Sequence, residues 1–273
     1  MEITNYFSPH LLKDKTVFIT GGGGDITLGM AKNYAAVGAN IATCGRTQET
    51  LDKASAELRE LGVEVYAETC DVRDYESMAR VINNTKEALG PIDVLVCGAA
   101  GNFLSPAENL SANGFKAVVD IDLIGSFNAC RAAFEQLKET KGSILFISAG
   151  QAFVPYHMQV HAGAAKAGID NMMKNLAMEW GKYGIRCNSI APGPIDETEG
   201  VKRLTIGGMD KQFKAAIPMG RYGTKDDIGQ AAVFLASPMA SYITGTLLVI
   251  DGGQNLLGGA AMGLIAQMMG QMK

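Results

Sequence analysis

The chain has 273 residues, 47% of them hydrophobic, which is enough apolar material for one large core. Its 24 basic and 28 acidic residues leave a formal net charge of −4 with no long run of either sign, so nucleic acid is not an expected partner. The five cysteines form no Cys-x-x-Cys pair, so neither a disulfide framework nor a zinc site is indicated.

We expect a cytoplasmic protein that is not bound to a membrane. The N-terminal segment lacks the basic and apolar regions of a signal peptide, and no apolar run reaches membrane-spanning length. The terminal Gln-Met-Lys is not a peroxisomal signal.

Short apolar runs of strand length alternate with segments of helical periodicity. The expected strands are 17–20, 40–44, 65–67, 94–96, 144–147, 187–190 and 247–250, and the expected helices include 51–61, 75–89, 115–137 and 160–180. This alternation predicts a parallel sheet covered by helices on both faces. Because no linker or composition break divides the chain, we predict a single α/β domain over 1–273, a Rossmann-type doubly wound sheet of about seven strands.

Two stretches fit this alternation less well. Residues 196–218 combine glycines with mixed charge, as in a loop that covers a substrate. Residues 258–273 form an apolar, Met-rich C-terminal tail. The tail is either a helix packed on a neighbouring subunit or an adaptable wall for an acyl chain.

The first expected strand runs into a glycine-rich turn, Thr20-Gly-Gly-Gly-Gly-Asp-Ile-Thr-Leu-Gly29, after which an apolar helix is expected. Such glycines let the backbone approach a pyrophosphate, and the helix N-terminus offers free N–H groups. The alternative is a turn with only a structural role. We assign to a dinucleotide site Gly21, Gly23, Gly24 and Ile26.

The second expected strand is followed by Arg46, where an NAD enzyme would place a carboxylate for the ribose 2′-hydroxyl. An arginine suits a 2′-phosphate, which favours NADPH as the cofactor. The alternative is a solvated surface arginine.

Several segments together resemble the short-chain dehydrogenase/reductase family, from Lys15 to about Gln254. They are the glycine turn, Cys70-Asp71-Val72, Cys97-Gly98-Ala99-Ala100-Gly101, Pro192-Gly193-Pro194-Ile195 and residues 245–253. The resemblance implies that Asp71 and Val72 lie near the adenine. It places further cofactor contacts at Ala99, Pro192, Gly193 and Ile195.

The glycine turn departs from the family pattern Thr-Gly-x-x-x-Gly-x-Gly, because its last two glycines align with Asp25 and Thr27. A carboxylate beside a pyrophosphate is repulsive, and a side chain at a close-approach position is a steric obstacle. Either the turn is shifted and uses Gly24 and Gly29, or the affinity for the cofactor is reduced.

The family's catalytic Tyr-x-x-x-Lys is altered. Lys166 is present, but Ala162 stands at the tyrosine position and Ala149 at the position of the family serine. Without these hydroxyls, ketone chemistry lacks a proton donor. A conjugated thioester is an alternative acceptor, because hydride addition at the far carbon creates an enolate whose oxygen can be held by donors while water protonates carbon.

Residues 99–106, 120–122, 160–163 and 191–194 resemble 2,4-dienoyl-CoA reductases, most closely the peroxisomal kind, and less closely trans-2-enoyl-CoA reductases. The resemblance implies that Asp122 and Lys166 are the catalytic pair. Lys166 would hold the nicotinamide ribose and stabilise the enolate, and Asp122 would orient the protonating water. The alternative for Asp122 is an ion pair with Lys166 and no further role.

Tyr156 and His161 are further catalytic candidates, and a structural hydrogen-bonding role is the alternative for each. The resemblance places Asn102 and Phe103 beside the substrate. Cations that could bind the phosphates of an acyl-CoA, or simply be solvated, are Lys202, Arg203, Lys211 and Lys214.

The sequence therefore predicts an NADPH-dependent reductase of 2,4-dienoyl-CoA or a similar thioester, and the resemblance implies a homotetramer. Two alternatives stay open. One is a 2-enoyl thioester reductase, or another short-chain reductase with an altered proton relay. The other is a cofactor-poor Rossmann scaffold that acts as a binding or assembly subunit.

Overall fold

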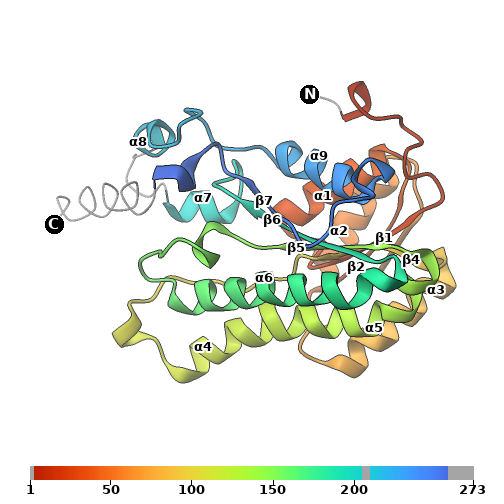
Figure 1. The fold of residues 1–273 in the computed structure, drawn as a ribbon, viewed down its shortest axis with the longest axis horizontal. Helices are drawn as coiled ribbons and strands as arrows, with labels where there is room; N and C mark the ends of the chain where they lie inside the picture. Colours follow the sequence, from red (N-terminus) through yellow and green to blue (C-terminus); the bar gives the residue numbers. More distant parts are fainter. Residues whose placement is uncertain (1–2, 205–209, 258–273) are drawn as a thin grey trace.

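A parallel sheet of seven strands forms the centre of the computed structural model, which describes residues 3–204 and 210–257 (Figure 1). The strands are β1 Thr16–Thr20, β2 Asn40–Gly45, β3 Val65–Thr69, β4 Ile92–Cys97, β5 Ser143–Ile147, β6 Arg186–Pro192 and β7 Leu247–Ile250. Their order is β3-β2-β1-β4-β5-β6-β7, and every neighbouring pair is parallel. All seven strands expected from the sequence are confirmed.

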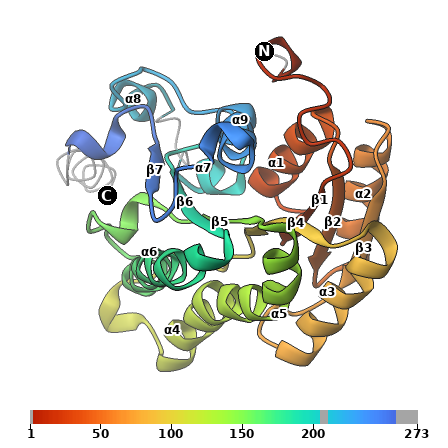
Figure 2. The same cartoon turned by 45° about the vertical axis from the view of Figure 1, so that its right-hand side comes forward.

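Helices cover both faces of the sheet (Figures 1 and 2). One face carries α1 Asp25–Ala36, α2 Gln48–Arg59 and α9 Lys225–Ala236. The other carries α3 Tyr75–Leu89, α5 Gly125–Thr140 and α6 Val160–Trp180, with α4 Ala112–Val119 leading into α5. This is the doubly wound arrangement, in which ligands bind at the carboxyl ends of the strands.

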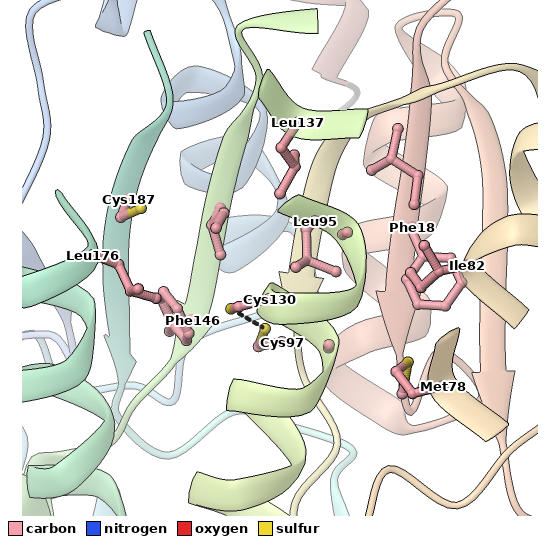
Figure 3. Close-up of a cluster of buried hydrophobic side chains, with 14 of the residues drawn as sticks. Phe18, Met78, Ile82, Leu95, Cys97, Cys130, Leu137, Phe146, Leu176 and Cys187 are labelled. Atoms are coloured by element: carbon pink, nitrogen blue, oxygen red, sulfur yellow. Dashed lines mark hydrogen bonds between the residues drawn. The ribbon is translucent and has the colours of Figure 1, made fainter. Parts of the chain in front are cut away.

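The strands read as continuous apolar runs because both of their faces are buried. In β1, Phe18 packs into the cluster under α3, α5 and α6, whereas Val17 and Ile19 pack into the cluster under α1 and α9. Figure 3 shows the first of these clusters, with the sulfurs of Cys97 and Cys130 3.8 Å apart. All five cysteines are free and buried, so they behave as small apolar core residues.

Some helix boundaries differ from the sequence-based expectation: the helix expected over 51–61 is α2, Gln48–Arg59. The helix after the glycine turn begins at Asp25, before the last glycine, because Gly21 takes φ +68° and Gly24 N–H closes the turn on Gly21 O at 3.0 Å. Gly29 lies inside α1, where a Cβ would meet the Lys225 side chain, so this glycine packs α1 against α9 and is not part of the turn.

The expected helix over 115–137 is interrupted. A π-helical turn, Asp120–Ile124, joins α4 to α5. Such turns insert one extra residue into the helical hydrogen-bond pattern and are frequent at functional sites. Periodicity alone could not distinguish this arrangement from one continuous helix.

The expected substrate loop, 196–218, contains two short helices, α7 Glu199–Leu204 and α8 Asp210–Ala215. They carry a small apolar cluster of their own, formed by Val201, Phe213, Ile217 and Tyr222. The C-terminal tail at 258–273 lies outside the described residues. Within the described residues, no helix combines the length and apolar character needed to cross a membrane.

Helix α9 supports α1, whose first turn begins the expected cofactor site, and α9 starts with a capping box. The Thr224 hydroxyl accepts from Asp227 N–H at 3.1 Å, and the Asp227 carboxylate accepts from Thr224 N–H at 2.7 Å. We expect Thr224→Ala to lower the free energy of unfolding by about 1 kcal/mol in denaturant titrations, because one N-terminal donor loses its partner. Thr224→Ser keeps the hydroxyl and should unfold like the parent; equal losses in both variants would contradict this account.

Candidate active site

Two adjoining pockets lie at the carboxyl ends of the strands. The first, about 410 Å³, runs from the glycine turn past Arg46, Asp71 and Ala99. The second, about 400 Å³, is lined by Lys166, Asp122 and many apolar side chains. The two pockets share lining residues, namely Ile26, Ala100, Ile147, Thr198 and Gly200. An elongated ligand in the first pocket can therefore present one end to the second.

The first pocket has the features that a dinucleotide requires. Gly21 has a positive φ, and a Cβ there would come within 2.9 Å of the Ala99 Cα, so the turn needs glycine. The N-terminus of α1, with Gly24 as its N-cap, opens into the pocket, and helix N-termini of this kind are suited to anions such as a pyrophosphate. In the second pocket, a Cβ on Gly193 would come within 2.7 Å of the Asp251 Cα.

The expected adenosine end contains Arg46, Asp71 and Val72 around one wall of the pocket. Arg73 binds both Asp71 carboxylate oxygens and lowers the pKa of Asp71 to about 2. Arg46 is exposed at the pocket edge. A cation beside a concave surface is compatible with a 2′-phosphate. Gly23, by contrast, does not line this pocket, and a Cβ there would come within 2.6 Å of Thr50.

Asp25 and Thr27, which replace the family's glycines, both line the first pocket. The exposed Asp25 accepts a hydrogen bond from Glu199 N–H at 3.0 Å and thereby connects the glycine turn to α7. The Thr27 hydroxyl donates back to Gly21 O at 2.6 Å and lies 3.1 Å from Gly24 O. The turn is therefore closed by a side chain that the family pattern does not contain.

Lys166 and Asp122 meet at the wall of the second pocket. Lys166 Nζ lies 3.1 Å from Asp122 Oδ2, and the two side chains are 9% and 1% exposed. Lys166 Nζ also donates to Ile147 O at 2.8 Å, and Asp122 Oδ1 accepts from Gly101 N–H at 2.7 Å. A buried ion pair is tolerated when its remaining donors and acceptors are satisfied, and this pair is held from α6, β5 and the segment after β4.

The π-helical turn places Asp122 within reach of Lys166. The turn bonds to α5 through Ser126, whose hydroxyl donates to Asp122 O at 2.5 Å. Lys166 reaches the pair from the second turn of α6, which runs alongside it. The structure thus brings together the two residues that the resemblance implied.

The hydroxyl positions of the family contain small apolar side chains here. Ala149 and Ala162 both line the second pocket beside Lys166. Ser148 also lines it, but its hydroxyl donates to Asp170 Oδ2 at 2.7 Å, one helical turn beyond Lys166. Burial raises the pKa of Asp170.

Tyr156 lines the second pocket from the loop after β5. Its hydroxyl donates to Asn255 Oδ1 at 3.1 Å, and Asn255 Nδ2 donates to Asp251 Oδ2 at 2.7 Å. Burial, together with the Asp251 carboxylate, raises the pKa of Tyr156, so the phenol keeps its proton at neutral pH. That proton is directed toward Asn255.

His161 does not line either pocket. It is fully buried, its ring centroid lies 4.5 Å from that of Phe103, and neither ring nitrogen has a hydrogen-bond partner among the described residues. Phe103 and Asn102 do line the second pocket, and Asn102 donates to Gln159 at 2.9 Å. His161 therefore packs against Phe103 outside the two pockets.

The proposed phosphate-binding cations are partly engaged elsewhere. Lys202 pairs with Glu199 at 2.7 Å and Lys214 with Asp210 at 2.9 Å. Lys211 is exposed, and the side chain of Arg203 lies outside the described part of the chain.

Sequence reasoning missed three residues of the site. Thr198 lines both pockets and donates to Ile195 O at 2.7 Å. Asp170 and Asn255 support Ser148 and Tyr156. Asp170 lies one helical turn after Lys166, a spacing that indicates a neighbouring position on the same helix face. Asn255 is 99 residues from Tyr156, and no pattern in the sequence connects the two.

The Asp25 carboxylate should oppose a bound pyrophosphate. We expect Asp25→Asn to tighten dinucleotide binding roughly two- to fivefold in calorimetric titrations, because the amide still accepts from Glu199 N–H while the charge is removed. The gain should shrink at high salt. Asp25→Ala, which loses the hydrogen bond as well, is the control. Weaker binding by the Asn variant would show that the charge is not repulsive here.

The comparisons with known proteins agree with this geometry. Residues 24–255 match the family model described as Enoyl-(Acyl carrier protein) reductase. The peroxisomal 2,4-dienoyl-CoA reductase of Saccharomyces cerevisiae, named as producing (3E)-enoyl-CoA, is 46% identical over 254 residues, covering 92% of this chain and 87% of its own. A Bacillus subtilis relative, named "Probable 2,4-dienoyl-CoA reductase" and as producing (2E)-enoyl-CoA, is 40% identical over 89% of this chain and 97% of its own.

The solved structures lead to the same family. A short chain dehydrogenase from Bacillus anthracis superposes with a TM-score of 0.81 at 40% identity, covering 89% of this chain and 98% of its own. On the family match, the sequence relatives and this structure, the chain belongs to the short-chain dehydrogenase/reductase family.

Proposed function

We propose that this protein is an NADPH-dependent reductase of 2,4-dienoyl-CoA or a closely similar conjugated acyl thioester. The observation that carries the proposal is the buried Lys166–Asp122 pair in a largely apolar cavity whose tyrosine and serine positions are Ala162 and Ala149. The names of the relatives support the same substrate class.

The substrate suits a site without a hydroxyl donor. A nicotinamide held in the first pocket would supply the hydride that adds to the δ carbon of the dienoyl thioester. The electron pairs shift toward the thioester, whose oxygen carries the resulting negative charge as a dienolate. One proton then adds to carbon, so the net change is one hydride and one proton. No proton has to be given to a carbonyl oxygen in this scheme.

Lys166 has the charge needed to stabilise the dienolate. Its ammonium has three N–H donors, of which Ile147 O and the Asp122 carboxylate take two within the described residues. The third donor is left for ligands in the pocket that Lys166 lines. A fixed cation in a water-poor pocket stabilises developing negative charge far better than one in bulk water.

Asp122 is placed to orient a water. One carboxylate oxygen accepts from Gly101 N–H and the other from Lys166, yet each oxygen has a second lone pair. A water bound there would lie beside the thioester end of the substrate, next to Lys166. We therefore propose protonation at the α carbon, which gives a 3-enoyl thioester as the product.

NADPH is the form of nicotinamide cofactor that we expect. Arg46 is the observation in favour, because it lines the expected adenosine end of the first pocket. Asp71, which also lines this end of the pocket, has both carboxylate oxygens engaged by Arg73.

A 2-enoyl thioester reductase is the second candidate, favoured by the description of the matching family model. In that reaction hydride adds to the β carbon, so the same Lys166 would hold an enolate of shorter conjugation. The scaffold alternative is favoured by the departures from the family pattern at Asp25, Thr27, Ala149 and Ala162. It requires that no dinucleotide binds.

A homotetramer and a cytoplasmic location stay predictions. Exposed apolar side chains on α4, the π-helical turn and α5, namely Phe115, Ile124 and Phe127, support assembly. Several relatives carry "peroxisomal" in their names, so the compartment has to be measured.

The decisive activity test offers the protein three acyl-CoA substrates, a 2,4-dienoyl, a 2-enoyl and a 3-ketoacyl thioester, with NADPH or NADH. We expect NADPH oxidation with the dienoyl-CoA and the lowest turnover with the ketoacyl-CoA. Preference for the 2-enoyl substrate would establish the second candidate. Turnover confined to the ketoacyl-CoA would overturn the proposal, and absence of dinucleotide binding would favour the scaffold.

The effect of Asp122 on turnover should be separable from its effect on NADPH binding. We expect Asp122→Asn to lower kcat by roughly 10²- to 10⁴-fold, because the water loses its carboxylate, while the Kd for NADPH changes little. Asp120→Asn is the matched control, since Asp120 lies on the same π-helical turn and pairs with the exposed Lys116. Lys166→Met should lower both kcat and NADPH affinity. Unaltered kcat in Asp122→Asn, with folding verified by thermal unfolding, would remove Asp122 from the mechanism.

A further inference from the structure

Two neighbouring positions of the first pocket have complementary side chains. Thr27 carries a side chain where the family turn has a glycine, and Gly98, directly after β4, has none. The two residues are 71 positions apart in the chain, but they face each other across the pocket wall.

Thr27 uses both branches of its side chain. The hydroxyl donates to Gly21 O at 2.6 Å and so closes the glycine turn. The methyl group points to Gly98, where an added Cβ would overlap the Thr27 Cγ2 atom. Thr27 is 4% exposed, so neither branch can swing into solvent.

Gly98 is held rigidly on the opposite side. Its N–H donates to Thr20 Oγ1 at 3.0 Å, and the next N–H, that of Ala99, donates to the same oxygen at 3.1 Å. An added Cβ would also come within 3.1 Å of Thr20 O. The end of β4 therefore cannot retreat from Thr27 without breaking its bonds to β1.

We propose that Thr27 and Gly98 are a matched pair that sets the separation of the two walls of the dinucleotide cleft. One wall is the start of α1, which offers N–H groups to the pyrophosphate, and the other is the Gly98-Ala99 segment. Close packing of the two walls uses the glycine at position 98, directly after β4, whereas the family turn has its glycine at position 27. The proposal rests on the proposed function, because it takes the ligand of this cleft to be NADPH.

The side-chain volumes at positions 27 and 98 are complementary, so the pair can be tested by adding a methyl group at one position and removing one at the other. Gly98→Ala should weaken NADPH binding about tenfold or more, because the new methyl pushes the two walls apart. Thr27→Ser removes the clashing methyl and keeps the hydroxyl, so Thr27→Ser/Gly98→Ala should recover most of the lost affinity. Recovery stays incomplete because Thr20 O still lies 3.1 Å from the new Cβ.

Two further variants isolate the causes. Thr27→Val keeps the volume but loses the bond to Gly21 O, and should weaken NADPH binding without rescue by a change at Gly98. Gly181→Ala adds a methyl where nothing lies within 4 Å, and should bind NADPH like the parent. Calorimetry gives the affinities, and the thermal unfolding midpoint without ligand gives a second readout.

The outcomes are distinct. Coupling between the two positions, in affinity or in the unfolding midpoint if Gly98→Ala folds poorly, supports the matched pair. Additive effects, or Gly98→Ala binding as tightly as the parent, would overturn it. If the unaltered protein binds neither NADPH nor NADH, the proposed function fails, and so does the assignment of the pair to a dinucleotide cleft. That failure is seen with the parent protein alone, before any variant is tested.

Discussion

The ion pair between Lys166 and Asp122 is the constraint on which the site depends. Two charges removed from water are stable only when they meet each other and when their other donors and acceptors are used. Three segments satisfy that requirement: β5 supplies Ile147 O, the segment after β4 supplies Gly101 N–H, and the π-helical turn supplies the carboxylate. Lys166 and Asp122 are thus fixed by backbone atoms at the end of the sheet.

The parallel sheet explains why two pockets become one functional site. The order of the strands places the β1–β4 neighbours at the point where the chain turns to the other half of the sheet, and a crevice opens there. The shared lining residues join the first pocket to the second. The α7 segment borders both pockets through Gly200 and is bonded to the glycine turn by Asp25, so one carboxylate connects the turn to residues 196–218.

Most of the fold could be predicted from sequence, because strands buried on both faces and long amphipathic helices leave strong periodic signals; 75–89 and 160–180 agree with α3 and α6 at both ends. The resemblance implied the catalytic pair. The π-helical turn and the start of α1 could not be predicted from the sequence. One extra residue in a helix, or a positive φ at one glycine, does not alter the hydrophobic periodicity. Contacts across the fold, such as Tyr156 with Asn255 or Thr27 with Gly98, depend on tertiary packing and had no local signal.

The central claim is that hydride goes to the far carbon of a conjugated thioester and that a water beside Asp122 protonates carbon. The most direct measurement is the position of solvent deuterium in the product formed from a 2,4-dienoyl-CoA and NADPH in D₂O. The account predicts one deuteron at C2 of a 3-enoyl thioester, with the hydrogen from the cofactor at C5. Solvent deuterium at C4 of a 2-enoyl product, or cofactor hydrogen at C3, would contradict it.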